Sequence, residues 1–370
     1  DDDRHGGKLP EIRTVSNRAD LLSGGDALIE IDLPGNDKHA EGMVVTVDGN
    51  DVSAAFARNA EGRIQGLLTG LAPGRHEVVA RAGKSGSAQL KLTMHPRGGP
   101  VISGEQAVPF VCATPVPQGA TATQPATIAS GMGTPPVDAQ CNTTTNYLFY
   151  YKSTSPGCTL ALPDPINRPA YGNANPPASV PPPANPCFRP MSFMIPPGDM
   201  ATTTTDDGQT VPYVVRVERG VINRGIYDIA VLWPSGPGGP GGARAQWNGK
   251  VVYHFGASTG QPRRQARPAT AWTDDRALSR GYMVVMNSMS DSLQNSNRVM
   301  MSETVMMMKE HIIEQYGPVR FTIGNGCSGG SIASNMVSTI GPGLLGGITA
   351  SCTYPDSVTV TMEVSGCVVL

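Results

Sequence analysis

The sequence predicts an α/β domain built on a mostly parallel sheet, preceded by a small all-β sandwich domain. Three observations support this prediction. Short alternating runs of apolar and polar residues fill residues 11–97, as in strands with one buried face. From residue 210 onward, strand-like runs alternate with helix-like runs, which is typical of a sheet covered by helices on both faces. Between them, residues 98–209 are rich in proline and glycine.

The all-β prediction depends on strands that are separated by turn residues at regular spacing. Clusters of Pro, Gly, Asn and Asp end each run, as they do in an immunoglobulin-like sandwich. Residues 1–10 precede the first run, and we expect them to form a flexible N-terminus. His76 and His95 lie in or beside these runs and are expected to be solvent-facing strand residues. The expected strands cover residues 27–33, 43–47, 76–82 and 88–94.

Residues 98–209 lack a clear period, and their proline runs do not fit regular core elements. The aromatic cluster at 147–151 is expected to form a local core. Four of the seven cysteines lie here, which favours an ordered segment held by disulfides over a flexible linker. The pairing stays open, and the odd count leaves one thiol free or without its partner; buried free thiols are the alternative. The disulfide candidates are Cys112, Cys141, Cys158, Cys187, Cys352 and Cys367.

The α/β domain is predicted for residues 210–370. An antiparallel pair is expected at 211–220 and 225–233. The helix expected at 299–316 ends at Gly317, which is followed by a proline. Its five methionines suggest adaptable packing and not a metal site. The other expected elements are strands at 250–255, 282–287 and 319–323, a helix at 331–340 and a further unit from 344.

A G-x-S-x-G pentapeptide, residues 326–330, lies between the strand expected at 319–323 and the helix expected at 331–340. This context predicts the nucleophile elbow of an α/β-hydrolase, with Ser328 as the nucleophile. The N–H of Gly329 is expected to donate to the oxyanion, together with that of Gly256 or Ala257 after an earlier strand. The alternatives are a tight turn that binds an anion at a helix N-terminus and a weakly matched nucleotide-binding G-x-G-x-x-G at 324–329.

The base that should activate Ser328 is harder to place. An α/β-hydrolase supplies its triad in the order Ser, acid, His, but all six histidines precede Ser328. His254, at the end of a strand expected beside the elbow strand, is the candidate substitute base; the alternative is an ordinary loop histidine. Asp356 is the candidate acid, with Asp291 as another acid at a strand end. His311 is expected on a helix surface.

Composition excludes several classes of function. The net charge is −2, so there is no electrostatic basis for binding nucleic acid or an anionic membrane. No apolar run approaches the ~20 residues that span a bilayer. No group of His and Cys has zinc spacing, and we expect neither a metal nor a cofactor. The cysteines favour an oxidising compartment, so the protein is expected to be secreted or periplasmic.

The Cys327-Ser328 pair resembles the nucleophile motif of tannases and fungal-type feruloyl esterases. The wider chain is similar to a tannase-like family of large secreted bacterial proteins of unassigned function, in residues 248–253, 324–331 and 352–356 and in the all-β part. In that family a Cys beside the catalytic His bonds the Cys before the Ser. The chain ends 42 residues after Ser328. The resemblance therefore implies a C-terminally truncated hydrolase that lacks the last strands of its sheet, with no partner for Cys327.

The function that the resemblance implies is ester hydrolysis through an acyl-enzyme at Ser328. The expected substrates are small or polymeric carboxylic esters of aromatic, hydroxyalkanoate or polyester type. The first alternative is a non-catalytic binding module on a degenerate or truncated hydrolase scaffold. The second is a nucleotide-binding α/β domain. The sequence leaves the ester and the oligomeric state open.

Overall fold

The computed structural model describes residues 10–33, 42–82, 86–155, 187–193, 197–234, 246–353, 358–360 and 362–363. The chain divides into two compact units. The first combines residues 1–106 with 306–319, and the second combines 107–305 with 320–370. Helix α3 (Arg298–Tyr316) therefore contributes to both units. The sequence predicts a boundary at residue 97, and the first stretch of this unit ends at residue 106.

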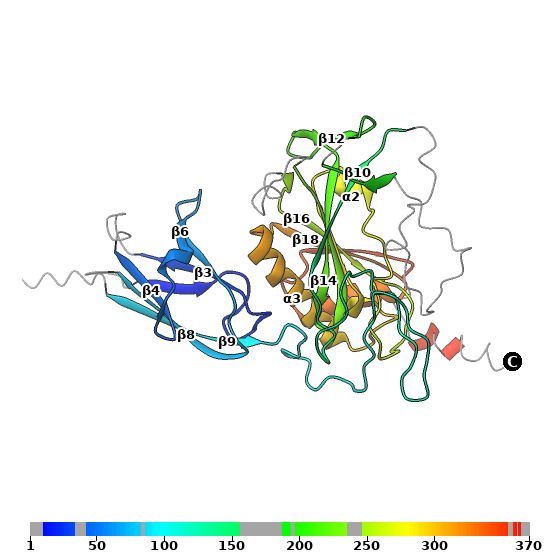
Figure 1. Cartoon of the computed structure of the whole chain (residues 1–370), viewed down its shortest axis with the longest axis horizontal. Helices are drawn as coiled ribbons and strands as arrows, with labels where there is room; N and C mark the ends of the chain where they lie inside the picture. Colours follow the sequence, from blue (N-terminus) through cyan, green and yellow to red (C-terminus); the bar gives the residue numbers. More distant parts are fainter. Residues whose placement is uncertain are drawn as a thin grey trace, which may run out of the picture. The chain divides into compact units, whose positions relative to one another are not determined.

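The first unit contains two sheets, one with the order β1-β3-β7-β6 and one with the order β2-β9-β8-β4-β5 (Figure 1). The four strands that the sequence predicted are all present, and β4 has the predicted bounds. Strand β7 was not predicted because Gly66 interrupts its pattern; a Cβ there would meet the ring of Phe56. The strands are β1 (Glu11–Thr14), β2 (Leu22–Ser23), β3 (Ala27–Asp32), β4 (Met43–Val47), β5 (Asn50–Asp51), β6 (Phe56–Arg58), β7 (Ile64–Leu68), β8 (Gly74–Ala82) and β9 (Ser87–His95), with a 3-10 turn η2 (Ser53–Ala55) before β6.

A single hydrophobic core joins the two sheets of the first unit. Alternate residues of the strands supply it, as expected for strands with one buried face. Ile29 and Val78, from different sheets, are both fully buried. These side chains account for the alternation by which the strands were predicted. The cluster consists of Ile12, Leu22, Ala27, Ile29, Ile31, Val45, Val47, Ile64, Leu68, Val78, Ala80, Leu92 and Met94.

Glu310, in the part of α3 that belongs to the first unit, is a buried carboxylate. It accepts hydrogen bonds from the Asn17 side chain (2.8 Å) and from the backbone N–H of Ser23 (2.5 Å). Burial raises its pKa from 4.5 to about 7, although these hydrogen bonds act to lower it; the nearby Asp26 raises it further. The folded protein therefore holds this proton more tightly than the unfolded chain.

This carboxyl group predicts that stability falls as the pH rises. A raised pKa in the folded state gives stability that is fully present below about pH 4.5 and is lost as the pH rises through about 7. The loss is on the order of 3 kcal/mol. Glu310→Gln should reduce the dependence of Tm on pH between 5 and 8; Glu314, whose pKa burial raises to about 9, retains part of it. The exposed Glu11→Gln should leave the dependence unchanged. Parallel curves for the wild type and Glu310→Gln would contradict the prediction.

The second unit is built on an eight-stranded sheet with the order β11-β10-β14-β15-β17-β16-β18-β19 (Figure 1). Along the chain, helix α3 precedes and helix α4 follows the strand that leads into the pentapeptide, as the sequence predicted. Strand β16 has the predicted bounds. The short helix α2 and the β12–β13 hairpin were not predicted. The elements are β10 (Asn146–Lys152), β11 (Phe188–Pro190), β12 (Thr202–Thr204), β13 (Thr210–Pro212), β14 (Val214–Ile222), β15 (Gly225–Leu232), β16 (Lys250–Phe255), α2 (Asp275–Leu278), β17 (Met283–Asn287), η5 (Ser288–Ser290), β18 (Phe321–Cys327), α4 (Gly329–Ile340) and β19 (Gly347–Ser351).

The sheet is mixed, which corrects the prediction of a mostly parallel one. Strands β17, β16, β18 and β19 pair in parallel, but every pairing from β11 to β17 is antiparallel. The reason lies in the connections, because a two-residue turn can join only antiparallel neighbours. Asn223 and Arg224 form this turn between β14 and β15, and both have positive φ (52° and 64°). The antiparallel pair predicted at 211–233 is confirmed.

Strand β10 places the predicted aromatic cluster in the sheet rather than in a separate local core. It pairs with β14, so the backbone gains a hydrogen-bonded neighbour that its own sequence did not reveal. Tyr150 is buried, and its ring lies 4.9 Å from that of Trp272. The ring of Phe188 from β11 lies 5.0 Å from the same tryptophan. These aromatic side chains pack with Val215, Val217, Ala230, Leu232 and Val284 in one core.

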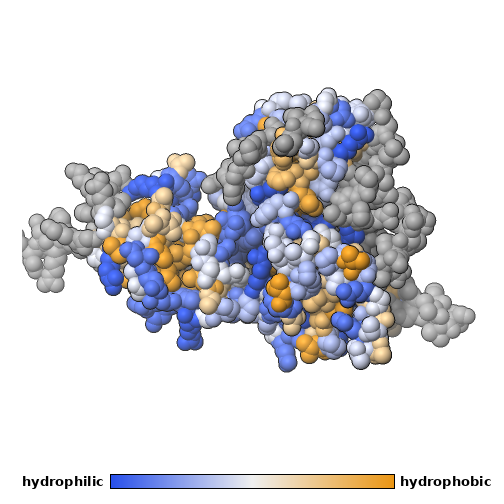
Figure 2. Space-filling model, in the orientation of Figure 1, coloured by the Kyte–Doolittle hydropathy of each residue, from blue (hydrophilic) through white to orange (hydrophobic). Residues whose placement is uncertain are grey.

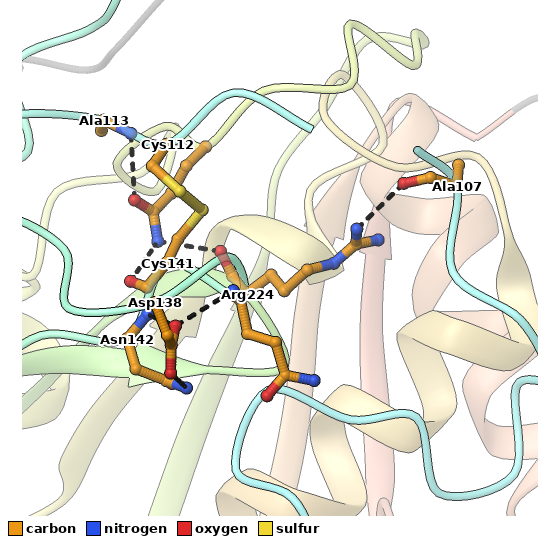
Figure 3. The surroundings of a disulfide bond; sticks show 9 residues. Ala107, Cys112, Ala113, Asp138, Cys141, Asn142 and Arg224 are labelled. Atoms are coloured by element: carbon orange, nitrogen blue, oxygen red, sulfur yellow. Dashed lines mark hydrogen bonds between the residues drawn. A yellow bond between two sulfur atoms is a disulfide. The ribbon is translucent and has the colours of Figure 1, made fainter. Parts of the chain in front are cut away.

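A disulfide between Cys112 and Cys141 orders the start of the second unit (Figure 3). The buried Gln265 side chain lies beside it and accepts from the N–H of Ala113 (3.1 Å). Its amide donates to the carbonyls of Cys141 (3.3 Å) and Arg224 (3.0 Å). One amide thus satisfies three backbone groups that would otherwise be buried without partners. The prediction of a disulfide-held segment agrees with this pairing.

The visible surface of each unit mixes hydrophilic and hydrophobic residues (Figure 2). In the described part of the chain, no helix combines the length and apolar character needed to cross a membrane. Cys187 is also disulfide-bonded, whereas Cys158 and Cys367 lie outside the described residues. Disulfides fit a protein of an oxidising compartment, such as the extracellular space.

Candidate active site

Ser328 occupies the sharp turn between β18, which ends at Cys327, and α4, which begins at Gly329. Its backbone has φ 56° and ψ −123°. A non-glycine residue in this region is strained, and such strain is concentrated at functional sites. The Ser328 side chain makes no capping hydrogen bond to the helix. The strand, the strained serine and the helix follow each other as the pentapeptide predicted.

Three glycines allow this turn to form. A Cβ at Gly326 would overlap the carbonyl group of Gly330, across the turn. A Cβ at Gly329 would overlap the carbonyl oxygen of Ser258, and one at Gly330 would overlap that of Phe255. The glycines are therefore needed for close packing of protein backbone on both sides of Ser328. This packing accounts for the glycine spacing without a bound nucleotide.

The peptide group between Ser328 and Gly329 is strongly polarised. The carbonyl of Ser328 accepts from the N–H of Ser331 (2.9 Å), the N–H of Ile332 (3.2 Å) and the hydroxyl of Ser331 (2.8 Å). Hydrogen bonds to a carbonyl strengthen the N–H of the same peptide group as a donor. That N–H belongs to Gly329, the candidate oxyanion donor, at the first turn of α4, where N–H groups have no partner within the helix.

The second candidate donor comes from the loop after β16. The N–H of Gly256 already donates to the Asp291 carboxylate (2.7 Å), which leaves the N–H of Ala257 as the candidate. Asp291 is fully buried and also accepts from the N–H of Ala269 (2.7 Å). Burial raises the pKa of Asp291 to about 7, although both N–H groups act to lower it.

His254 lies on β16 directly beside Asn325 of β18, three residues before Ser328. Its Nε2 lies 3.1 Å from an Asp274 carboxylate oxygen, and its Nδ1 lies 3.3 Å from Nδ2 of Asn325. Burial acts to raise the pKa of Asp274, but the hydrogen bonds from His254 and the backbone hold it below its usual range. Both ring nitrogens thus contact side chains other than that of Ser328. Within the described ranges, no His, Asp or Glu side chain is hydrogen-bonded to the Ser328 hydroxyl.

The structure overturns the expectation that Cys327 lacks a partner. Cys327 is bonded to Cys352, with their Cα atoms 5.0 Å apart. The physical reason is the register of β18 and β19, which pairs Cys327 with Ser351 and so brings the next residue within reach. The resemblance had instead implied that the partner of Cys327 is a cysteine beside the catalytic histidine. Asp356, the candidate acid, lies outside the described residues.

Several residues around the elbow were missed or left without a role in the sequence interpretation. Asn325 and Asp274 bind His254, Ser331 binds the Ser328 carbonyl, and Asp291 had only been noted as an acid at a strand end. Only the spacing of Ser331 after Ser328, one helical turn, was a signal in the sequence. By contrast, the expected packing of the methionines is confirmed: Met300, Met301 and Met306–Met308 are buried. His311, expected on the surface, is partly buried.

The second unit thus combines a mixed sheet with helices and carries a strained serine, a candidate nucleophile, at a turn from strand to helix. The chain matches the family described as "Tannase-like family of unknown function (DUF6351)" over residues 12–370 and belongs to it. This membership confirms the resemblance found in the sequence, and a tannase-like family suggests a hydrolase of the esterase type. No curated protein matches the chain.

Two solved structures show a low overall similarity. Oligopeptidase B from Leishmania major is 10% identical, with a TM-score of 0.25, and the match covers 92% of this chain and 42% of that one. Oligopeptidase B from Trypanosoma brucei with covalently bound antipain, in a closed form, is 10% identical, with a TM-score of 0.26 and coverage of 95% and 50%. The chain thus spans half the length of these proteins or less.

Proposed function

We propose that this protein is a serine ester hydrolase that forms an acyl-enzyme at Ser328. The observation that carries the proposal is the strained backbone of Ser328 (φ 56°, ψ −123°) at a glycine-packed turn from strand to helix. This turn exposes the hydroxyl group of a nucleophilic serine in α/β-hydrolases. Membership of a tannase-like family supports the same chemistry.

The sheet supports an α/β-hydrolase assignment for the second unit. Counted from β14, the strands lie in the order first, second, fourth, third, fifth and sixth, and the nucleophile follows the fifth. The second strand is antiparallel to its neighbours, and the later ones are parallel. This is the order expected of an α/β-hydrolase sheet. The two sheets of the first unit and their common core fit the proposed immunoglobulin-like sandwich.

The reaction begins when the Ser328 oxygen attacks the ester carbonyl carbon and gives up its proton to a base. The carbonyl becomes an oxyanion, to which the N–H groups of Gly329 and Ala257 donate. The oxyanion collapses, the bond to the alcohol oxygen breaks, and the alcohol leaves with a proton. Water then attacks the acyl-serine, which releases the carboxylic acid and restores the serine. The proposed substrates are aromatic, hydroxyalkanoate or polyester-type esters, and the proposed location is secreted or periplasmic.

A fluorophosphonate probe tests the nucleophile directly. The probe should form a covalent adduct with the folded protein, and peptide mapping should place the adduct on Ser328. An adduct on another serine would refute the assignment. A chain that neither labels nor hydrolyses p-nitrophenyl acetate would favour the alternative, a non-catalytic binding module on a hydrolase scaffold.

The contacts of His254, the candidate base of the sequence analysis, lead to a separate prediction. Both ring nitrogens bind neighbours, so we expect the ring to hold Asn325 and Asp274 in place. His254→Ala should lower stability by about 2 kcal/mol, because it removes a buried ring and its contacts with the partly buried Asp274 and Asn325. It should keep more than about a tenth of the turnover, since removing a general base costs ~10²-fold or more. A loss as large as that of a nucleophile variant would instead make His254 the base.

A further inference from the structure

Asp291 bridges two points, Gly256 and Ala269, of the connection between β16 and α2. The residue follows η5 after β17, and its side chain is fully buried. One carboxylate oxygen accepts from the N–H of Gly256 at 2.7 Å, and the other accepts from the N–H of Ala269 at 2.7 Å. The carboxylate is so close to Gly256 that a Cβ at this glycine would overlap it. Residue 256 must therefore be glycine while Asp291 occupies this position.

The next residue extends the connection to the elbow itself. The N–H of Ser292 donates to the carbonyl of Gly256 (3.1 Å), so Gly256 is bound through both of its backbone groups. The Ser292 hydroxyl donates to the carbonyl of Gly329 (2.8 Å) and accepts from the guanidinium of Arg298 (3.1 Å). Asp291 and Ser292 thus connect the loop after β16 to the first turn of α4.

The loop held in this way also contacts the elbow. A Cβ at Gly330 would lie 3.1 Å from the carbonyl carbon of Phe255 and 3.2 Å from the carbonyl oxygen of Gly256. A Cβ at Gly329 would overlap the carbonyl oxygen of Ser258. The backbone from 255 to 258 is therefore packed against the turn that carries Ser328. Ala257, in the middle of this stretch, is exposed, and the N–H of Gly256 is already bound.

We propose that Asp291 is a positioning residue that fixes the backbone of Gly256, and with it the N–H of Ala257, beside Ser328 as the second oxyanion donor. This inference rests on the proposed function of Ser328. The side chain at position 291 must supply two acceptors, because two N–H donors face it and each needs one. A carboxylate offers an acceptor to both. The amide of an asparagine offers one, and its NH₂ group would face the other N–H.

The test compares Asp291→Asn with Glu218→Gln, which neutralises another buried acid of the same sheet, on β14. Three kinds of measurement are made on variants shown to be folded by circular dichroism. They are kcat and KM for p-nitrophenyl acetate, the affinity for phenylboronic acid, which forms a tetrahedral adduct with serine, and hydrogen exchange at the amides of residues 256 and 269.

For Asp291→Asn we expect kcat to fall about 100-fold, the scale for loss of one oxyanion donor, with KM changed by less than about threefold. Affinity for the boronic acid should fall in parallel, and exchange at both amides should accelerate. Glu218→Gln should keep kcat within about twofold even where its Tm falls, since its effect is on stability alone. A folded Asp291→Asn with wild-type kcat and slow exchange would overturn the proposal.

Two further outcomes are distinguishable. If Asp291→Asn does not fold, Gly256→Ala disturbs the same contact from the opposite side and should reproduce the loss of kcat; wild-type kcat in this variant overturns the proposal. If the wild-type protein neither hydrolyses the ester nor binds the boronic acid, the proposed function fails, and the catalytic part of this inference fails with it. The exchange experiment then still shows whether Asp291 holds the loop.

Discussion

Ser328→Ala is expected to abolish both the burst and the steady-state hydrolysis of p-nitrophenyl acetate, with a loss of at least about 10⁴-fold. The variant lacks the oxygen that attacks the ester, whereas the rest of the elbow is maintained by backbone groups. The N–H of Ser328 donates to the carbonyl of Ser351 (3.2 Å), and the carbonyl of Ser328 accepts the bonds from Ser331 and Ile332. Because the hydroxyl makes no capping bond, its removal should change Tm little.

Ser331→Ala is the matched control for this experiment. It removes a buried hydroxyl from the same turn, but it leaves the nucleophile and the two backbone bonds to the Ser328 carbonyl. We expect the burst to remain and the turnover to fall by less than about tenfold, the scale of one weakened hydrogen bond. Turnover that persists in Ser328→Ala, or an equal loss in both variants, would exclude Ser328 as the nucleophile.

Gly326→Ala is expected to destabilise the second unit by about 3 kcal/mol or more, because the new methyl group would overlap backbone atoms of Gly330. Neither stretch of backbone can move away: Gly326 is held in β18 between β16 and β19, and Gly330 lies in the first turn of α4. The turn should open, so that fluorophosphonate labelling is lost together with stability.

Gly346→Ala is the control for the general effect of replacing glycine by alanine, which restricts the backbone of the unfolded chain. A Cβ there would lie 3.6 Å from the carbonyl oxygen of Thr322, an ordinary contact, and its φ lies outside the left-handed region. The free energy of unfolding of this variant should lie within about 1 kcal/mol of that of the wild type. Denaturant unfolding of both variants measures the difference. Equal stability of Gly326→Ala and the wild type would contradict the packing described for the elbow.

Dense runs of β-branched residues made some elements predictable to the residue. Residues 43–47 and 250–255 are bounded by turn residues, and the structure begins and ends both strands there. Strand β10 was missed as a strand because its neighbour β14 lies more than 60 residues away in the chain. Pairing over such distances depends on the whole sheet and leaves no local period. The same limit led to the prediction of a mostly parallel sheet.

The candidate site shows the same division between local and distant information. Ser328 and its glycines could be predicted, since a pentapeptide between a strand and a helix carries the signal within a few residues. The bonds of Asp291 and of His254 join residues 20–71 positions apart and depend on which loops meet at the end of the sheet. The bond from Cys327 to Cys352 depends in turn on the register of β18 and β19.

The shared helix α3 has a practical consequence for dissecting this protein. The compact unit that holds the nine strands from β1 to β9 draws residues 306–319 from a point 200 residues further along the chain. A gene fragment ending near residue 106 would therefore lose the helical segment that supplies Glu310 to Asn17 and Ser23. Expression trials that cut the chain at this boundary should yield a less stable fragment, and a circularly permuted or co-expressed helix should restore it. Because each unit is assembled from two separate stretches of the chain, neither can be cut out or exchanged as a single continuous segment.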